Sequence, residues 1–258
     1  MPNHVENLIN FNCTDERYNE IINFMHTSDE DAFDFNQLIP MPKEMDVTAG
    51  GFDADFIRAY IKSLPANESE KIIRKLKSMR HGIFGSYYDE YFNGVVRDMT
   101  DERKKWIEDS IEREYGKHNV HTMEDVGKLY IDNILKYGCA NWYEWCNKNW
   151  GTKWNAYDVY YGENGDKCVC FNTAWSPVPK IIIELSKKFK DVGMEYSWAD
   201  EDIGYNVGRL DILNGEVIDE FIPEGGTNEA YELAFDILGC EDMFEYDEEK
   251  GTYVYCEE

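Results

Sequence analysis

The hydrophobic pattern is typical of β-strands at both ends of the chain. Apolar and polar residues alternate there, and a period of two indicates a strand with one buried face. The pattern holds over residues 5–13, 156–161, 167–173, 192–199, 205–213 and 216–222. Asn164-Gly165 and Asn214-Gly215 predict tight hairpin turns between neighbouring strands. We also expect a short extended stretch at 33–39 and a small hairpin from 243–246 and 253–256.

Helical spacing occupies most of the remaining chain. Apolar residues recur every three or four positions, which predicts amphipathic helices. The predicted helices are residues 15–26 after the cap Thr14, four helices within 50–137, a helix with Pro177 in its first turn, and 227–238 between Thr227 and Gly239. The block 50–137 carries 15 basic and 16 acidic residues, so it is almost neutral.

The order of these elements predicts an α+β fold. Without the helical block, the order is β-α-β-β-α-β, which is the ferredoxin-like split βαβ plan with an antiparallel sheet. We expect helices on one face of the sheet, and an opposite face that is solvated, covered by the insertion, or used for binding. The predicted parts are 1–45 (first β-α part), 46–140 (helical insertion), 141–222 (remainder of the ferredoxin-like domain) and 223–258 (acidic C-terminal helix and hairpin).

Charge is concentrated in the last quarter of the chain. The 258 residues carry 52 acids and 26 bases, a net charge of −26. Residues 191–258 hold 21 acids and only two bases, Arg209 and Lys250, so their net charge is −19. This balance argues against direct nucleic-acid binding and against an anionic membrane surface, since both require basic residues.

Two interpretations of the acidic tract remain open. It can serve solubility or salt adaptation, or it can present carboxylates as a row of phosphates does, and so block basic grooves of nucleic-acid-binding proteins. The candidate partner-binding acids are Asp200, Glu201, Asp202, Asp211, Glu216, Asp219, Glu220 and Glu224.

A tryptophan-rich segment carries a family resemblance. Residues 149–156 read NWGTKWNA, and residues 173–177 read TAWSP. With the opening residues 2–11 and the tract 36–42, these motifs resemble the YubB ferredoxin-like family of plasmid and phage proteins. The resemblance covers roughly 1–45 and 138–222. It implies a ferredoxin-like fold and a mobile-element origin, and it implies no activity and no catalytic residue.

The tryptophans have two possible roles. They can pack between sheet and helices, where each aromatic side chain buries about 150–250 Å². They can instead line a pocket for a planar ligand such as a nucleotide, with amide and lysine contacts. The residues of this candidate pocket are Trp142, Trp145, Asn149, Trp150, Lys153, Trp154, Asn155 and Trp175.

The sequence contains little else that indicates chemistry. No catalytic residues, cofactor motif or metal site can be assigned, and the chain is more typical of a binding protein than of an enzyme. Cys168 and Cys170 lie on one face of a strand without two further metal ligands, and we expect them to be buried and inert. Seven cysteines and no apparent secretory signal indicate reduced thiols in the cytoplasm of a bacterial host.

These observations give two hypotheses for function. In the first, an acidic mobile-element protein binds and inhibits a host nucleic-acid-binding or defence protein that has a basic surface, by DNA mimicry. In the second, the tryptophan-rich region binds a small ligand or nucleotide, or serves an uncharacterised enzyme.

Overall fold

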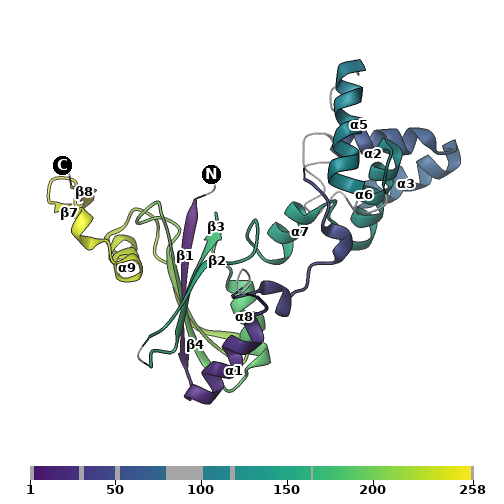
Figure 1. Cartoon of the computed structure of the whole chain (residues 1–258). Coiled ribbons are helices and arrows are strands. Elements are labelled where there is room, and N and C mark those ends of the chain that lie inside the picture. Colours follow the sequence, from purple (N-terminus) through teal and green to yellow (C-terminus); the bar gives the residue numbers. More distant parts are fainter. Residues whose placement is uncertain are drawn as a thin grey trace. The chain divides into compact units, whose positions relative to one another are not determined.

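The computed structural model describes residues 3–28, 32–49, 53–79, 101–116, 120–163 and 165–256 (Figure 1). The chain divides into two compact units. We call residues 1–40 with 149–258 the sheet unit, and residues 41–148 the helical unit. The division lies at 40/41 and 148/149, so the helix that precedes the NWGTKWNA motif is grouped with the helical unit rather than with the sheet.

The sheet unit contains a six-stranded sheet with the order β2-β3-β1-β4-β5-β6. All neighbouring strands are antiparallel. The strands are β1 (His4–Asn12), β2 (Tyr157–Tyr161), β3 (Cys168–Ala174), β4 (Gly193–Asp200), β5 (Gly208–Leu213) and β6 (Glu216–Phe221). The first four of these strands, with α1 (Asp15–Met25) and α8 (Pro179–Lys188), have the order of a split βαβ domain. The predicted ferredoxin-like α+β fold is therefore confirmed, and β5 and β6 extend its sheet.

One face of this sheet is buried under α1 and α8 (Figure 1). Strand β1 alternates between buried and partly exposed residues, as the sequence pattern predicts. Asn7 is the polar exception on its buried face. Its Nδ2 donates to Thr173 Oγ1 at 2.9 Å, and its Oδ1 accepts from the Tyr196 hydroxyl at 2.6 Å. That hydroxyl also accepts from the Val178 backbone N–H at 2.8 Å, so a buried network joins three strands to the start of α8.

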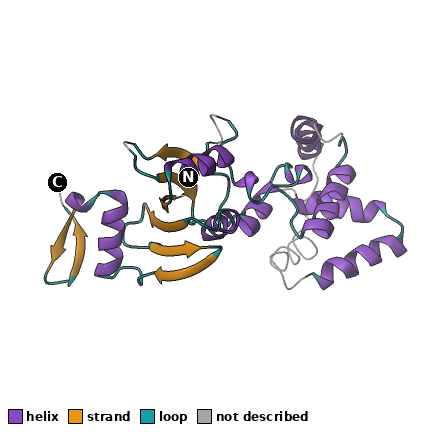
Figure 2. Ribbon diagram, turned by 90° about the horizontal axis from the view of Figure 1, so that it is seen from below, coloured by secondary structure: helices purple, strands orange, loops and turns teal. Residues whose placement is uncertain are grey.

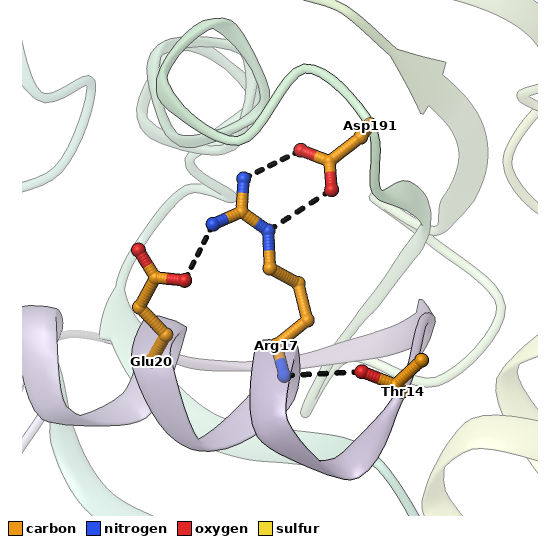
Figure 3. Close-up of polar contacts among 4 residues, drawn as sticks. All are labelled: Thr14, Arg17, Glu20 and Asp191. Carbon is orange, nitrogen blue, oxygen red and sulfur yellow. Dashed lines mark hydrogen bonds and ion pairs between the residues drawn. The ribbon is translucent and has the colours of Figure 1, made fainter.

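Helix α1 is fixed at its N-terminus by a cap and an ion pair (Figure 3). Thr14 Oγ1 accepts from the Arg17 backbone N–H, as the sequence predicts for an N-cap. The Arg17 guanidinium makes two hydrogen bonds to Asp191, at 3.0 and 2.5 Å, and a third to Glu20. The guanidinium lowers the pKa of Asp191 from its usual value. This contact ties α1 to the loop that follows α8.

Helix α9 (Asn228–Leu238) packs on the opposite face of the sheet, over one end of β4 (Figure 1). Ala199, Val207, Ala230 and Ala234 form this small second core. Thr227 caps the helix and Gly239, at φ 62°, ends it, as predicted. The rest of this face is not covered by α1, α8 or α9, and we call it the open face.

The C-terminal hairpin lies beside α9 (Figure 2). It consists of η4 (Glu241–Met243), β7 (Phe244–Asp247) and β8 (Thr252–Tyr255). Phe235 of α9 packs on Phe244 and Tyr253, with ring centroids 5.2 and 5.1 Å apart. Aromatic packing of this kind stabilises a two-stranded hairpin that would be marginal alone. The predicted hairpin is therefore present, one residue displaced in each strand.

Two local predictions in the sheet unit are wrong. Residues 33–39 are not extended. They contain the 3₁₀ turn η1 (Phe35–Gln37), because Asp34 Oδ1 accepts from the Asn36 backbone N–H and starts a turn. Helix α8 begins at Pro179 rather than at Pro177, since Val178 is its N-cap. The predicted Asn164-Gly165 turn after β2 includes Asn164, which lies outside the described residues.

The helical unit buries its own core. Its elements are η2 (Lys43–Met45), α2 (Asp53–Ser63), α3 (Ala66–Ser78), α5 (Asp101–Tyr115), α6 (Met123–Tyr137) and α7 (Trp142–Asn149). Helices α2 and α6 approach closely at Gly127, where an added Cβ would lie 2.0 Å from the Phe56 carbonyl oxygen. The four predicted helices correspond to α2, α3, α5 and α6, whereas α7 is an element that the sequence pattern did not predict.

Candidate functional site at the acidic edge of the sheet

Strand β6 is the outermost strand of the sheet, and all six of its side chains are exposed. Among the strands that the structure describes, it pairs with β5 alone. Its sequence, EVIDEF, mixes Glu216, Asp219 and Glu220 with large apolar residues. Ile218 is 64% exposed, and Val217 and Phe221 are each 41% exposed. An uncovered edge of this kind leaves backbone N–H and C=O groups available for pairing.

The strand register distributes the acids of β5 and β6 over both faces of the sheet. Asp211 of β5 pairs with Glu195 on one side and with Asp219 on the other, so three carboxylates form a row on the open face. Side chains that pair directly across strands have Cβ atoms about 4.5–5.5 Å apart, and like charges there repel. Glu220 pairs with Leu210 and therefore points to the helix-covered face. We call Asp211, Glu216, Asp219 and Glu220 the acidic edge.

A β-bulge shapes the beginning of β6. Asp211 pairs with Asp219, whereas the next residue, Ile212, pairs with Val217, so Ile218 is the extra residue. Beside it is an open cavity of about 540 Å³. The cavity is lined by Asn10, Phe11, Asn12, Gly193, Met194, Glu195, Asp211, Ile212 and Ile218. Residues of β1, β4 and β5 thus line the cavity together with Ile218 of the edge strand.

Sequence reasoning missed Glu195, Asn10 and Ile218 as members of this site. Asn10 Nδ2 donates to Glu195 Oε1 at 3.2 Å, which holds the first carboxylate of the row in place. The missing information was the strand order, since β1 and β4 are far apart in the chain and adjacent in the sheet. The pairing of β1 with β4 is what places Asn10 opposite Glu195.

Asp200 was predicted as a partner-binding residue, and its burial is against that role. Its side chain is buried, and its carboxylate accepts from the Asn3 and Asn206 side-chain amides and from the Asp202 backbone N–H, at 2.9–3.1 Å. These bonds shape the turn between β4 and β5, so the carboxylate is not on the surface. Glu201 and Asp202 are exposed in the same turn.

Glu224 lies in the loop between β6 and α9, and it is exposed. The Gly226 backbone N–H donates to the Gly204 carbonyl at 2.8 Å, so this loop is bonded to the turn that carries Glu201 and Asp202. Seven of the eight predicted acids are thus exposed or partly exposed, on the edge strand, on β5 and on these two loops.

The tryptophan-rich motif is divided between structural and surface residues. Trp150 is buried, and its Nε1 donates to the Ile39 carbonyl at 2.9 Å. Asn155 Nδ2 donates to Asp34 at 2.7 Å, while its Oδ1 accepts from the Phe35 backbone N–H. Both residues therefore bond the motif to the segment 34–39. This is the packing role that was one of the two predicted for the motif.

Lys153, Trp154 and Trp175 form an exposed group in the sheet unit. The Lys153 ammonium lies 4.5 Å from the Trp154 ring centroid and 4.8 Å from that of Trp175. Such distances are those of cation–π contacts. The two indoles are 36% and 41% exposed. Trp175 also has a positive φ of 70°, which is a strained conformation for a bulky side chain.

The remaining pocket candidates belong to α7. Trp145 is buried, and Asn149 is the last residue of the helix. Trp142 is partly exposed and packs edge-to-face against Tyr143. The structure therefore brings together Lys153, Trp154 and Trp175 within the sheet unit. Trp150 and Asn155 instead form hydrogen bonds within that unit, to the segment 34–39.

The strand cysteines are only half-buried, contrary to the prediction. Cys168 and Cys170 lie on the open face, and Cys170 Sγ lies 3.3 Å from Glu6 Oε1. Burial, with Glu6 adding to it, raises the pKa of the Cys170 thiol to about 12, so this thiol is protonated at neutral pH. Within the described ranges, no three His, Cys, Asp or Glu side chains are grouped closely enough to hold a metal ion.

Residues 149–241 match a family model described as the ferredoxin-like domain in Api92-like protein. A ferredoxin-like domain of the Api92-like family is therefore present, and it contains β2 to β6, α8 and α9. The chain is also similar to the crystal structure of a protein Api92 from Yersinia pseudotuberculosis, with 10% identity and a TM-score of 0.36 over 88% of this chain and 100% of that one. No curated protein matches the chain. Among its described helices, none is both long and apolar enough to cross a membrane.

Proposed function

We propose that this protein binds a partner protein with a basic surface through the acidic edge. The observation that supports the proposal is β6, an uncovered edge strand that contains three acids and three exposed apolar residues. Isolated surface acids need no partner, but an exposed apolar patch rimmed by charge is typical of an interaction surface. Strands β4, β5 and β6 together carry six acids and one base, Arg209, so the partner must be basic.

We further propose that the partner is a nucleic-acid-binding or defence protein of a bacterial host, which this protein inhibits in the cytoplasm. The net charge of −19 over residues 191–258 favours rapid association with a basic groove through electrostatic steering. The chain itself is not expected to bind nucleic acid. Its resemblance to plasmid and phage proteins supports a mobile-element origin.

The proposed mechanism is DNA mimicry at a lower charge density than that of DNA. B-DNA carries one charge per ~1.7 Å of helix axis. A row of carboxylates on adjacent strands has a spacing of about 4.8 Å, so it supplies roughly a third of that density. The acids can therefore occupy a few phosphate positions of a basic groove, while the apolar residues of β6 add contacts that DNA does not make.

The test is capture of host proteins by two matched variants. The edge variant is Glu216→Gln/Asp219→Asn/Glu220→Gln. The helix control, Glu229→Gln/Asp236→Asn/Glu241→Gln, removes the same charge from exposed positions outside the sheet. We expect the wild type and the helix control to capture the same basic protein from a bacterial lysate at low salt, the edge variant to lose it, and added duplex DNA to displace it. Equal capture by the two variants, or no displacement by DNA, would contradict the proposal.

A second candidate function is the binding of a planar anionic ligand at Lys153, Trp154 and Trp175. Two half-exposed indoles beside one ammonium group offer stacking surfaces and a positive charge, which suit a nucleotide. A nucleotide panel monitored by tryptophan fluorescence tests this. We expect quenching that disappears in Trp154→Phe and persists in Trp106→Phe, a control at a tryptophan that is 54% exposed in the helical unit. This site is excluded if quenching is unchanged in Trp154→Phe, or if no nucleotide of the panel quenches the tryptophan fluorescence of the wild type.

A further inference from the structure

The uncovered edge of β6 and the acidic row beside it indicate how a partner is bound. We infer that an extended segment of the partner, with Lys or Arg alternating with apolar residues, adds to β6 as a seventh strand of the sheet. This inference rests on the proposed function and specifies its contacts: backbone hydrogen bonds to the edge, apolar contacts to β6, and cationic side chains on the acids.

The backbone provides the first part of the argument. Strand addition takes its affinity from main-chain hydrogen bonds to an exposed sheet edge and its specificity from alternate side chains. Strand β6 supplies such an edge at the end of a six-stranded sheet, with Ile218 at 64% exposure in the middle of it. The added strand would cover Val217, Ile218 and Phe221, which are otherwise exposed to water.

Charge identifies the occupant. Proteins commonly place charges on edge strands to prevent pairing with a second copy of the same chain. Here Glu216, Asp219 and Glu220 on one β6 would face the same three acids on another, so a second copy is disfavoured. The same carboxylates favour a strand that carries Lys or Arg, and they therefore select a basic partner rather than a copy of this chain.

The cavity beside the bulge provides an independent feature. The row of Glu195, Asp211 and Asp219 leads from the cavity to the edge on the open face. A Lys or Arg side chain from the added strand, on that face, can extend over Asp219 towards Asp211 and Glu195. It would relieve the repulsion within the row, while the exposed Ile218 contacts its methylene groups.

The test uses a ten-residue peptide that alternates Lys with Val, titrated into the full ¹⁵N-labelled chain. We expect binding with amide shifts confined to β5, β6 and the cavity, and none with the peptide in which Glu replaces Lys. N-methylation on both peptide edges removes the inward-facing N–H groups, so it should weaken binding at least tenfold. N-methylation on one edge only should change the affinity less than threefold, because the other edge can still pair.

Substitutions in the chain test the acidic row. Glu195→Gln keeps an acceptor for Asn10, and with Asp211→Asn it should weaken the Lys-Val peptide severalfold. The helix control should bind as the wild type does. Failure of the Lys-Val peptide to bind, shifts outside β5, β6 and the cavity, or equal affinity of the doubly methylated peptide would overturn strand addition. If strand addition is overturned but the edge variant fails to capture the basic host protein, the proposed function stands without this mode of binding. If the edge variant captures that protein, the proposed function itself is wrong.

Discussion

At the scale of single residues, the NWGTKWNA and TAWSP motifs owe most of their positions to packing. Thr152 Oγ1 accepts from the Ala174 backbone N–H and donates to its carbonyl, so the first motif is bonded directly to the second. Trp150 is buried, and the partly buried Asn155 is bonded to Asp34. The residues that packing does not explain are Lys153, Trp154 and Trp175, and these are the ones that remain candidates for binding.

Trp175 should reveal its backbone strain in a pair of substitutions. At φ 70° a side chain is disfavoured and glycine is not. We expect Trp175→Gly to be more stable than Trp175→Ala by about 1 kcal/mol, although glycine normally lowers stability. Urea unfolding of both variants measures the difference. A less stable glycine variant would show that Trp175 is not strained in solution.

Glu144 is a buried acid whose effect on stability should depend on pH. It accepts from the Ala140 backbone N–H at 2.7 Å, while Asn141 Oδ1 accepts from the Glu144 N–H, so both side chains satisfy backbone N–H groups at the start of α7. Burial raises the pKa of Glu144 above its unfolded value. Stability from this group is therefore present below about pH 4 and is lost as the pH rises through the folded pKa.

Glu144→Gln isolates that titration, because glutamine keeps an acceptor for Ala140 and does not ionise. We expect the stability of the variant relative to the wild type to increase from pH 3 to pH 7. Urea unfolding at five pH values measures it, and all other titrating groups cancel in the difference. A constant difference would mean that Glu144 titrates normally in the fold.

At the scale of elements, the contact between α2 and α6 depends on one glycine. A Cβ on Gly127 would lie 2.0 Å from the Phe56 carbonyl oxygen and 2.6 Å from its carbonyl carbon. Backbone atoms cannot yield as a flexible side chain can, so Gly127→Ala should destabilise the helical unit by about 1–3 kcal/mol despite the better helix propensity of alanine. Gly116→Ala is the matched control, since its Cβ meets only a Glu112 side chain at 3.5 Å.

Calorimetry of both glycine variants measures the effect. Because the chain divides into two compact units, we expect the sheet unit to keep its unfolding transition in Gly127→Ala. Equal melting of the Gly127→Ala and Gly116→Ala proteins would show that α2 and α6 are farther apart in solution.

At the scale of the whole molecule, a net charge of −26 should make stability depend on salt. Like charges repel in the folded state, and the Debye length falls from about 30 Å at 0.01 M to about 3 Å at 1 M salt. We expect Tm to rise by several degrees between 0.01 and 0.5 M NaCl, where 1 kcal/mol corresponds to about 2–4 °C for a chain of 150–250 residues. KCl in place of NaCl is the control for a specific ion effect. A Tm that is flat or falling with salt would show that self-repulsion is not significant.

The sequence by itself determined the elements and their class. Strands and helices are specified by local signals, without reference to distant residues. These signals are period-two alternation, helical spacing, the N-caps Thr14 and Thr227, and the C-cap Gly239. The α+β class, the split βαβ order and the −19 charge of residues 191–258 could all be predicted in this way. The turn at 33–39 and helix α7 were missed because elements of three and eight residues are too short to show a helical hydrophobic period.

Only the tertiary structure decided which residues share a surface. Strand order and register place Asn10 of β1 beside Glu195 of β4, and Asp211 between Glu195 and Asp219, and no local pattern specifies such pairings. It also placed Asp200 in the interior and made β6 the edge of the sheet. The physical reason is that a strand's neighbours are chosen by burial of the whole sheet, whereas a residue's secondary structure is chosen largely by its immediate sequence.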